Sequence, residues 1–172
     1  MKLTFALMIY SILMFQDIRA ETYMGPTSLE EKVLKDADFM GPTQLKDVTA
    51  ESLSVMGSLT GKNIICKMLD VMGPVEVMHL KVEGEASIMG PLTANQSKFE
   101  NLSIVADEII LEDVEVNNIS IKQEKTKKQV LQLKGSTLVK GNITFESGKG
   151  IIEQDPGVKI QGKIKGAIVE KK

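Results

Sequence analysis

The chain has 172 residues, of which 42% are hydrophobic and 26% charged, so a single folded domain is the expected organisation. The net charge of −2 argues against a nucleic-acid-binding protein, which is normally basic. Aromatic residues make up only 4% of the chain and tryptophan is absent, so the core has to be built from aliphatic side chains and methionine.

Residues 1–20 have the pattern of a secretory signal peptide. Lys2 supplies a short positive start, residues 3–15 form an apolar run, and the small residue Ala20 precedes the expected cleavage site. The run is too short to span a bilayer comfortably, and no second apolar run follows it. We therefore expect an exported protein, in the periplasm, at the cell surface or in the medium, with no transmembrane segment in the mature chain.

From residue 24 onward the chain divides into aligned units of sixteen or seventeen residues. The first five units begin with Met24-Gly25-Pro26, Met40-Gly41-Pro42, Met56-Gly57, Met72-Gly73-Pro74 and Met89-Gly90-Pro91. A sixth unit, residues 105–121, keeps the apolar pattern without the Met-Gly-Pro start. A fixed period of this kind is typical of solenoid proteins.

Inside a unit, apolar residues come in pairs two positions apart, as in Val75 and Val77, or Leu80 and Val82. This spacing indicates short strands, since alternate side chains of a strand share a face. We predict an all-β, single-stranded parallel β-solenoid: a three-sided β-helix with about sixteen to seventeen residues per rung and eight or nine rungs. At about 4.8 Å per rung, the rod would be roughly 40 Å long.

The Met-Gly-Pro segments are predicted to form the corner where each circuit closes. Proline has no N–H to place in a strand ladder, and glycine adopts backbone angles that other residues avoid. The methionines should stack as a column and pack near this corner. A soft-metal site or a docking surface along the column are the alternatives.

The second half of the chain changes its corners. KQEKTKK begins at Lys122, and residues 122–129 are predicted to be a charged loop between the first rungs, residues 21–121, and the last. Residues 130–172 should form glycine-cornered rungs of the same solenoid. At the N-terminal end of the rod, the charged residues Glu30, Glu31, Lys32 and Lys35 are expected to act as a cap.

The stretches GNITF and VKIQGKIKGAIV, together with the rung length, resemble the β-helical core of bactofilins, the polymer-forming cytoskeletal proteins. The Met-Gly-Pro part is similar to small exported proteins of unassigned function in Gram-negative bacteria. The resemblance implies a β-helical fold and self-association, and it implies no reaction.

The sequence offers little for catalysis or metal binding. Cys66 is the only cysteine, so an internal disulfide cannot form, and its apolar neighbours predict a buried thiol. His79 is the only histidine, and the apolar alternation places it at an exposed corner. One His and one Cys cannot supply the usual zinc ligand sets or a nucleophile-histidine relay. We therefore expect no enzyme activity, no metal and no cofactor.

Two features leave alternatives open. The acidic segment around Asp107, Glu108, Glu112 and Asp113 could supply carboxylates to a carbohydrate-binding or carbohydrate-active solenoid. Four Asn-x-Ser/Thr sequons occur, and we interpret their asparagines as corner residues, although they are also glycosylation acceptors in a eukaryotic secreted chain. These asparagines are Asn95, Asn101, Asn118 and Asn142.

The leading hypothesis is an exported, non-enzymatic structural or adhesive solenoid whose flat faces bind a partner or another copy. The expected partners are the chain itself, a surface protein or a glycan, and not a nucleic acid. The alternatives are the carbohydrate-active solenoid and a bactofilin-like envelope scaffold.

Overall fold

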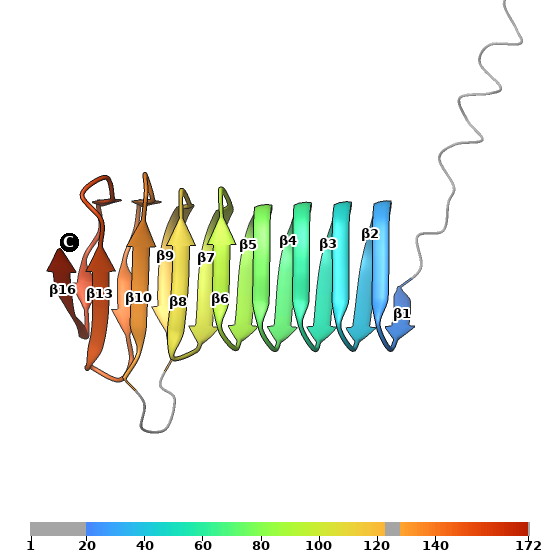
Figure 1. Ribbon diagram of the computed structural model, residues 1–172, viewed down its shortest axis with the longest axis horizontal. Helices are drawn as coiled ribbons and strands as arrows, with labels where there is room; N and C mark the ends of the chain where they lie inside the picture. The colour runs from blue at the N-terminus through green and yellow to red at the C-terminus, as the bar shows by residue number, and fades with distance from the viewer. Residues whose placement is uncertain (1–19, 123–127, 172) are drawn as a thin grey trace, which may run out of the picture.

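A computed structural model describes residues 20–122 and 128–171, which form a parallel β-solenoid of about nine turns (Figure 1). The described residues contain strands and corners but no helix. The all-β solenoid predicted from the sixteen-residue period is therefore confirmed. The expected signal peptide, apart from Ala20, lies outside the described residues, and so does the middle of the charged loop, residues 123–127.

The first turns are nearly continuous strands, each interrupted only at the Met-Gly corner. The short β1 (Glu21–Met24) leads into β2 (Thr27–Met40), β3 (Thr43–Met56), β4 (Leu59–Met72) and β5 (Val75–Met89). Each of the last four makes one circuit and pairs in parallel with the next. We expected three separate strands per turn. The strands instead continue around the other two corners, because only one residue at each corner leaves the ladders between β2, β3 and β4.

Later turns are divided more finely. The strands are β6 (Leu92–Asn95), β7 (Lys98–Val105), β8 (Glu108–Glu112), β9 (Glu115–Ile121), β10 (Val130–Lys134), β11 (Leu138–Val139), β12 (Ile143–Phe145), β13 (Gly150–Gln154), β14 (Lys159–Ile160), β15 (Ile164–Lys165) and β16 (Ala167–Lys171). β10 pairs with β8 on one side and with β13 on the other. The turns after the charged loop therefore continue the same stack.

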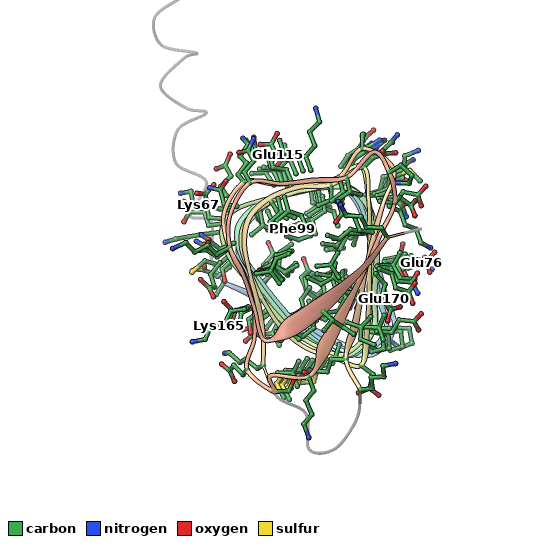
Figure 2. All side chains as sticks on the ribbon, turned by 90° about the vertical axis from the view of Figure 1, so that its left-hand side faces the viewer. Lys67, Glu76, Phe99, Glu115, Lys165 and Glu170 are labelled. Atoms are coloured by element: carbon green, nitrogen blue, oxygen red, sulfur yellow. The ribbon has the colours of Figure 1, made fainter. Side chains whose placement is uncertain are left out.

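The core is a set of aliphatic columns that run along the axis. In one column Leu53, Leu69, Ala86 and Leu102 occupy equivalent positions in successive turns, and all four are buried. Seen along the axis, Phe99 points into the ring, while Lys67 and Glu115 point outward (Figure 2). A single turn has only one layer of apolar side chains, so each turn is buried by its neighbours above and below.

The seventeen-residue unit is accommodated at a corner. β5 has one residue more than β4, and its register shifts after Cys66 on one side and after Val82 on the other. The shift falls around Gly84, where an added Cβ would lie 2.8 Å from the backbone oxygen of Lys67. The insertion therefore leaves the core columns intact.

Candidate interaction surface

The predicted methionine column is present, but it lies outside the core. Met24, Met40, Met56, Met72 and Met89 pair in register along the axis. Each of them ends a strand, and their side chains are between 42% and 78% exposed. The preceding residue in each turn, such as Phe39 or Val55, points inward, so the alternation of the strand turns the methionine outward.

The glycines after these methionines allow close stacking of the corners. Gly41, Gly57, Gly73 and Gly90 have φ between 137° and 150°, which favours glycine. A Cβ added to Gly57 would lie 2.4 Å from the backbone oxygen of Gly41.

The next position is proline in four of the five corners and Ser58 in the other. Its carbonyl still accepts a ladder bond: the Thr27 N–H donates to the Pro42 oxygen at 2.9 Å. Proline at this position lacks only the backbone N–H, and the corner needs no hydrogen-bond donor there. The four prolines are Pro26, Pro42, Pro74 and Pro91.

A second corner is made by polar residues with left-handed backbone angles. Their φ values lie between 46° and 56°, and they are Glu31, Asp47, Asn63, His79, Gln96 and Asp113. The Asn63 Nδ2 amide donates to Asp47 Oδ1 at 2.7 Å. His79 lies between two amide oxygens, with Nδ1 3.0 Å from Asn63 Oδ1 and Nε2 2.7 Å from Gln96 Oε1. The predicted exposed corner position of His79 is confirmed, and its ring is a member of a stacked polar row.

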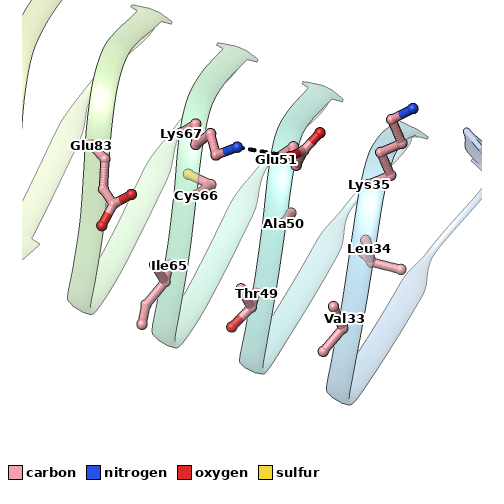
Figure 3. Close-up of a pocket in the computed structure, with 10 residues that line it drawn as sticks. All are labelled: Val33, Leu34, Lys35, Thr49, Ala50, Glu51, Ile65, Cys66, Lys67 and Glu83. Atoms are coloured by element: carbon pink, nitrogen blue, oxygen red, sulfur yellow. Dashed lines mark hydrogen bonds and ion pairs between the residues drawn. The ribbon is translucent and has the colours of Figure 1, made fainter. Parts of the chain in front are cut away.

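An open groove of about 580 Å³ crosses the first turns (Figure 3). One side is the exposed row Val33, Thr49 and Ile65, which are paired in register. Between the two sides lie the inward-facing Leu34, Ala50 and Cys66, which are buried. The predicted burial of Cys66 is confirmed, and burial raises the pKa of its thiol to about 12.

The other side of the groove is a row of alternating charges, Lys35, Glu51, Lys67 and Glu83, which we call the charge row. Glu51 accepts a hydrogen bond from the Lys67 Nζ at 2.8 Å, and this bond lowers the pKa of the Glu51 carboxyl. The positive charge of Lys35 lowers the same pKa further. The hydrogen bond to Glu51 raises the pKa of Lys67, and the negative charge of Glu83 adds to this rise. Glu83 itself accepts a hydrogen bond from the Lys81 Nζ at 2.5 Å. All four charges are thus coupled along the axis.

The charge row was not singled out in the sequence, although a signal for it exists. Its members stand eleven residues after Met24, Met40, Met56 and Met72, at the same offset in four consecutive units. The fixed offset of these charged residues within the unit is therefore the sequence signal that predicts the charge row.

The side chains of the acidic segment around β8 do not converge on one site. Asp107 precedes β8 at one corner, and Asp113 follows it at another, about 20 Å away at the rise of an extended strand. Asp113 Oδ1 accepts hydrogen bonds from the Ser136 N–H at 2.9 Å and its Oγ at 2.8 Å, and these bonds lower the pKa of Asp113. Glu108 and Glu112 are exposed at the two ends of β8. The segment therefore supplies separate corner carboxylates.

Three of the four sequon asparagines form a ladder at a further corner. The Asn118 Nδ2 donates to Asn101 Oδ1 at 3.1 Å, and the Asn142 N–H donates to Asn118 Oδ1 at 3.1 Å. The Lys163 N–H in turn donates to Asn142 Oδ1 at 2.9 Å. These side chains act in corner hydrogen bonding. Asn95 is the last residue of β6, and its backbone oxygen accepts a hydrogen bond from the Ser97 hydroxyl at 2.7 Å.

Comparison with protein-family models, with curated proteins and with solved structures found no match for this chain. Among the residues that the structure describes, no three His, Cys, Asp or Glu side chains gather as metal ligands. No helix in residues 20–122 and 128–171 is long and apolar enough to cross a membrane. The most regular surface features of the described residues are the methionine column and the groove with its charge row.

Proposed function

We propose that this chain is an exported, non-enzymatic structural or adhesive protein, a short rod whose flat faces bind another copy or a partner. In this role it would be similar to the polymer-forming bactofilins that its repeat resembles. The export signal in residues 1–20 supports an envelope or extracellular location.

The observation that carries this proposal is the order of the exposed apolar side chains. Most of the large apolar residues that the fold leaves exposed lie on the sides of the rod, and they are Met24, Val33, Met40, Met56, Ile65, Met68, Met72, Met78 and Met89. Five of them form one continuous column. A contiguous apolar strip on a folded surface is typical of a binding site, and methionine is common at such surfaces because its side chain adapts to a partner.

The fold suits this role because its binding elements repeat. Each turn presents an equivalent methionine at the spacing of neighbouring strands, about 4.8 Å. A partner contacting the column therefore gains several equal contacts at once, and a repetitive partner gains the most.

The test begins with the full-length chain, expressed with residues 1–20 in a Gram-negative host. We expect the mature protein to be recovered from the envelope or the medium with Glu21 as its first residue. Chemical cross-linking in intact cells should then give adducts with itself or with an envelope component. Retention in the cytoplasm with Met1 still present, or exported protein without any adduct, would contradict the proposal.

Two variants make the test specific to the column. The double substitution Met56→Gln and Met72→Gln keeps side-chain length but adds polarity, and it should reduce the adducts. The matched control, Thr60→Gln, places the same side chain on an exposed position of another face and should leave them unchanged. Hydrolysis of a glycan by the wild-type protein, lost in Asp113→Asn, would instead favour the carbohydrate-active alternative.

A further inference from the structure

The groove on the first turns carries a charge pattern that is complementary to itself. Along the axis, the charge row reads plus, minus, plus, minus from Lys35 to Glu83. All four residues are exposed, and they belong to four consecutive turns. When the order is reversed, it reads minus, plus, minus, plus. Two such rows that face each other in opposite directions therefore pair every charge with its opposite.

We propose that a second copy of this chain packs on this groove, with the two rods antiparallel and related by a two-fold axis between β3 and β4. This inference rests on the proposed function and names the partner for one face. Lys35 then faces the partner's Glu83, and Glu51 faces the partner's Lys67. An interface of this kind is isologous, so each contact occurs twice.

The exposed row Val33, Thr49 and Ile65 on the other side of the groove is paired by the same two-fold rotation. Thr49 faces the partner's Ile65, and the exposed Val33 faces the aliphatic stem of the partner's Lys81. Val33 is 72% and Ile65 43% exposed, so the packing covers two of the most exposed aliphatic side chains of the rod. The small side chain of Ala50, between the rows, keeps the groove open for them.

Two further observations favour a second copy over another occupant. Both rods have the same rise per turn, so four successive contacts stay in phase without distortion. The alternation also ends where the overlap must end. After Glu83 the next exposed residue of the row is Glu100, which repeats the sign, and the described residues before the turn of Lys35 form only the short β1. In a parallel pair, related by a two-fold axis along the rods, each charged residue would lie opposite the same residue of the other copy, so like charges would face each other.

The two charge-swap variants that test this proposal have identical composition. E51K/K67E changes the order to plus, plus, minus, minus, which remains complementary to its own reverse. K35E/E51K gives minus, plus, plus, minus, which places like charges opposite each other at every contact. Within one chain the ranking is opposite, since E51K/K67E creates two like-charged neighbours and K35E/E51K only one. Repulsion within the chain therefore predicts that K35E/E51K is the more stable variant, whereas the proposed interface predicts that E51K/K67E forms the tighter dimer.

The measurement is sedimentation equilibrium of the wild-type chain and both variants, with circular dichroism as a check of folding. We expect dimers for the wild type and for E51K/K67E, and a dissociation constant roughly tenfold higher or more for K35E/E51K. Dimers that do not distinguish the two variants would overturn the proposal. A wild type that stays monomeric at every concentration would overturn it as well, whereas the export and cross-linking results above would stand independently.

A second pair of variants covers a failure of either swap to fold. K35E/K67E makes the row entirely negative, and E51K/E83K makes it entirely positive. Each should be monomeric alone, and an equimolar mixture should form heterodimers that dissociate as salt is added. A mixture that remains monomeric would overturn the proposal.

Discussion

Lys32 stands in register with Val48, so the first full turn carries an exposed ammonium group where the next turns carry buried aliphatic side chains. Ile64 and Leu80 continue the column below Val48. A charge at the head of an apolar column opposes the stacking of another molecule on this end of the rod, since the ammonium would lose its water.

We therefore expect Lys32→Val to promote end-to-end association. Valine would extend the apolar column to the end of the rod, and its burial against another molecule is worth about 1.5 kcal/mol. Sedimentation velocity should show species larger than those of the wild type. Lys62→Val, which removes a charge from the side of the rod, is the control. Larger species in the control but not in Lys32→Val would contradict this reading of the end.

Gly57→Ala should destabilise the protein more than Gly25→Ala. Both glycines have positive φ, so each substitution carries backbone strain of about 1–3 kcal/mol. At Gly57 the new Cβ would also lie 2.4 Å from a backbone oxygen, whereas at Gly25 nothing lies within 4 Å. The midpoints of urea unfolding give the comparison. Equal losses at the two sites would show that stacking at the corner is unimportant.

The Cys66 thiol should be unreactive in the folded protein. Burial raises its pKa from 9.0 to about 12, so the neutral thiol is favoured in the folded state. The stabilisation from this group is complete below pH 9 and is lost as the pH rises toward 12, by roughly 1.4 kcal/mol per pH unit. The free energy of unfolding of Cys66→Ala should fall less steeply over this range. A thiol reagent that labels the native protein as fast as the unfolded chain would contradict the burial.

Glu115→Gln should remove a small, pH-dependent contribution to stability. The Glu115 carboxylate is 2.7 Å from both the Lys98 and the Lys140 ammonium groups, and their hydrogen bonds lower its pKa to about 2. The carboxylate is partly exposed, so we expect a loss of only about 0.5–1 kcal/mol at neutral pH. This contribution is present above about pH 4.5 and disappears as the pH falls toward 2. The melting temperature of Glu115→Gln should converge with that of the wild type as the pH is lowered. The exposed control Glu76→Gln should show no such convergence.

The period in the sequence was sufficient to predict the stacking. Because Met40, Met56 and Met72 recur every sixteen residues, their in-register pairing follows from a fixed rise and circumference. Their outward direction could also have been inferred from the inward-facing residue before each one. The interpretation of the column as packing overlooked that step of alternation.

The left-handed corner and the groove depend on backbone geometry and on contacts between turns that the amino-acid sequence does not display directly. The left-handed corner is occupied by Asp47, Asn63 and His79 rather than by glycine, so no glycine signal marks it. Their side chains bond to one another across the turns, and this helps to offset the strain of the backbone. The groove likewise depends on small Ala50 standing between two exposed rows, a relationship across turns that no single unit displays.

The unbroken register of β2, β3 and β4 makes a single turn an exchangeable module. Removing residues 43–58 would join Pro42 to Leu59, which holds the place of Thr43 in the next turn, and every column would close again. The rod would shorten by about 4.8 Å without any change in cross-section. Duplication of one repeat would lengthen it by the same step, so a genetic change at this level alters the reach of the molecule and the order of the charge row while the cross-section stays the same.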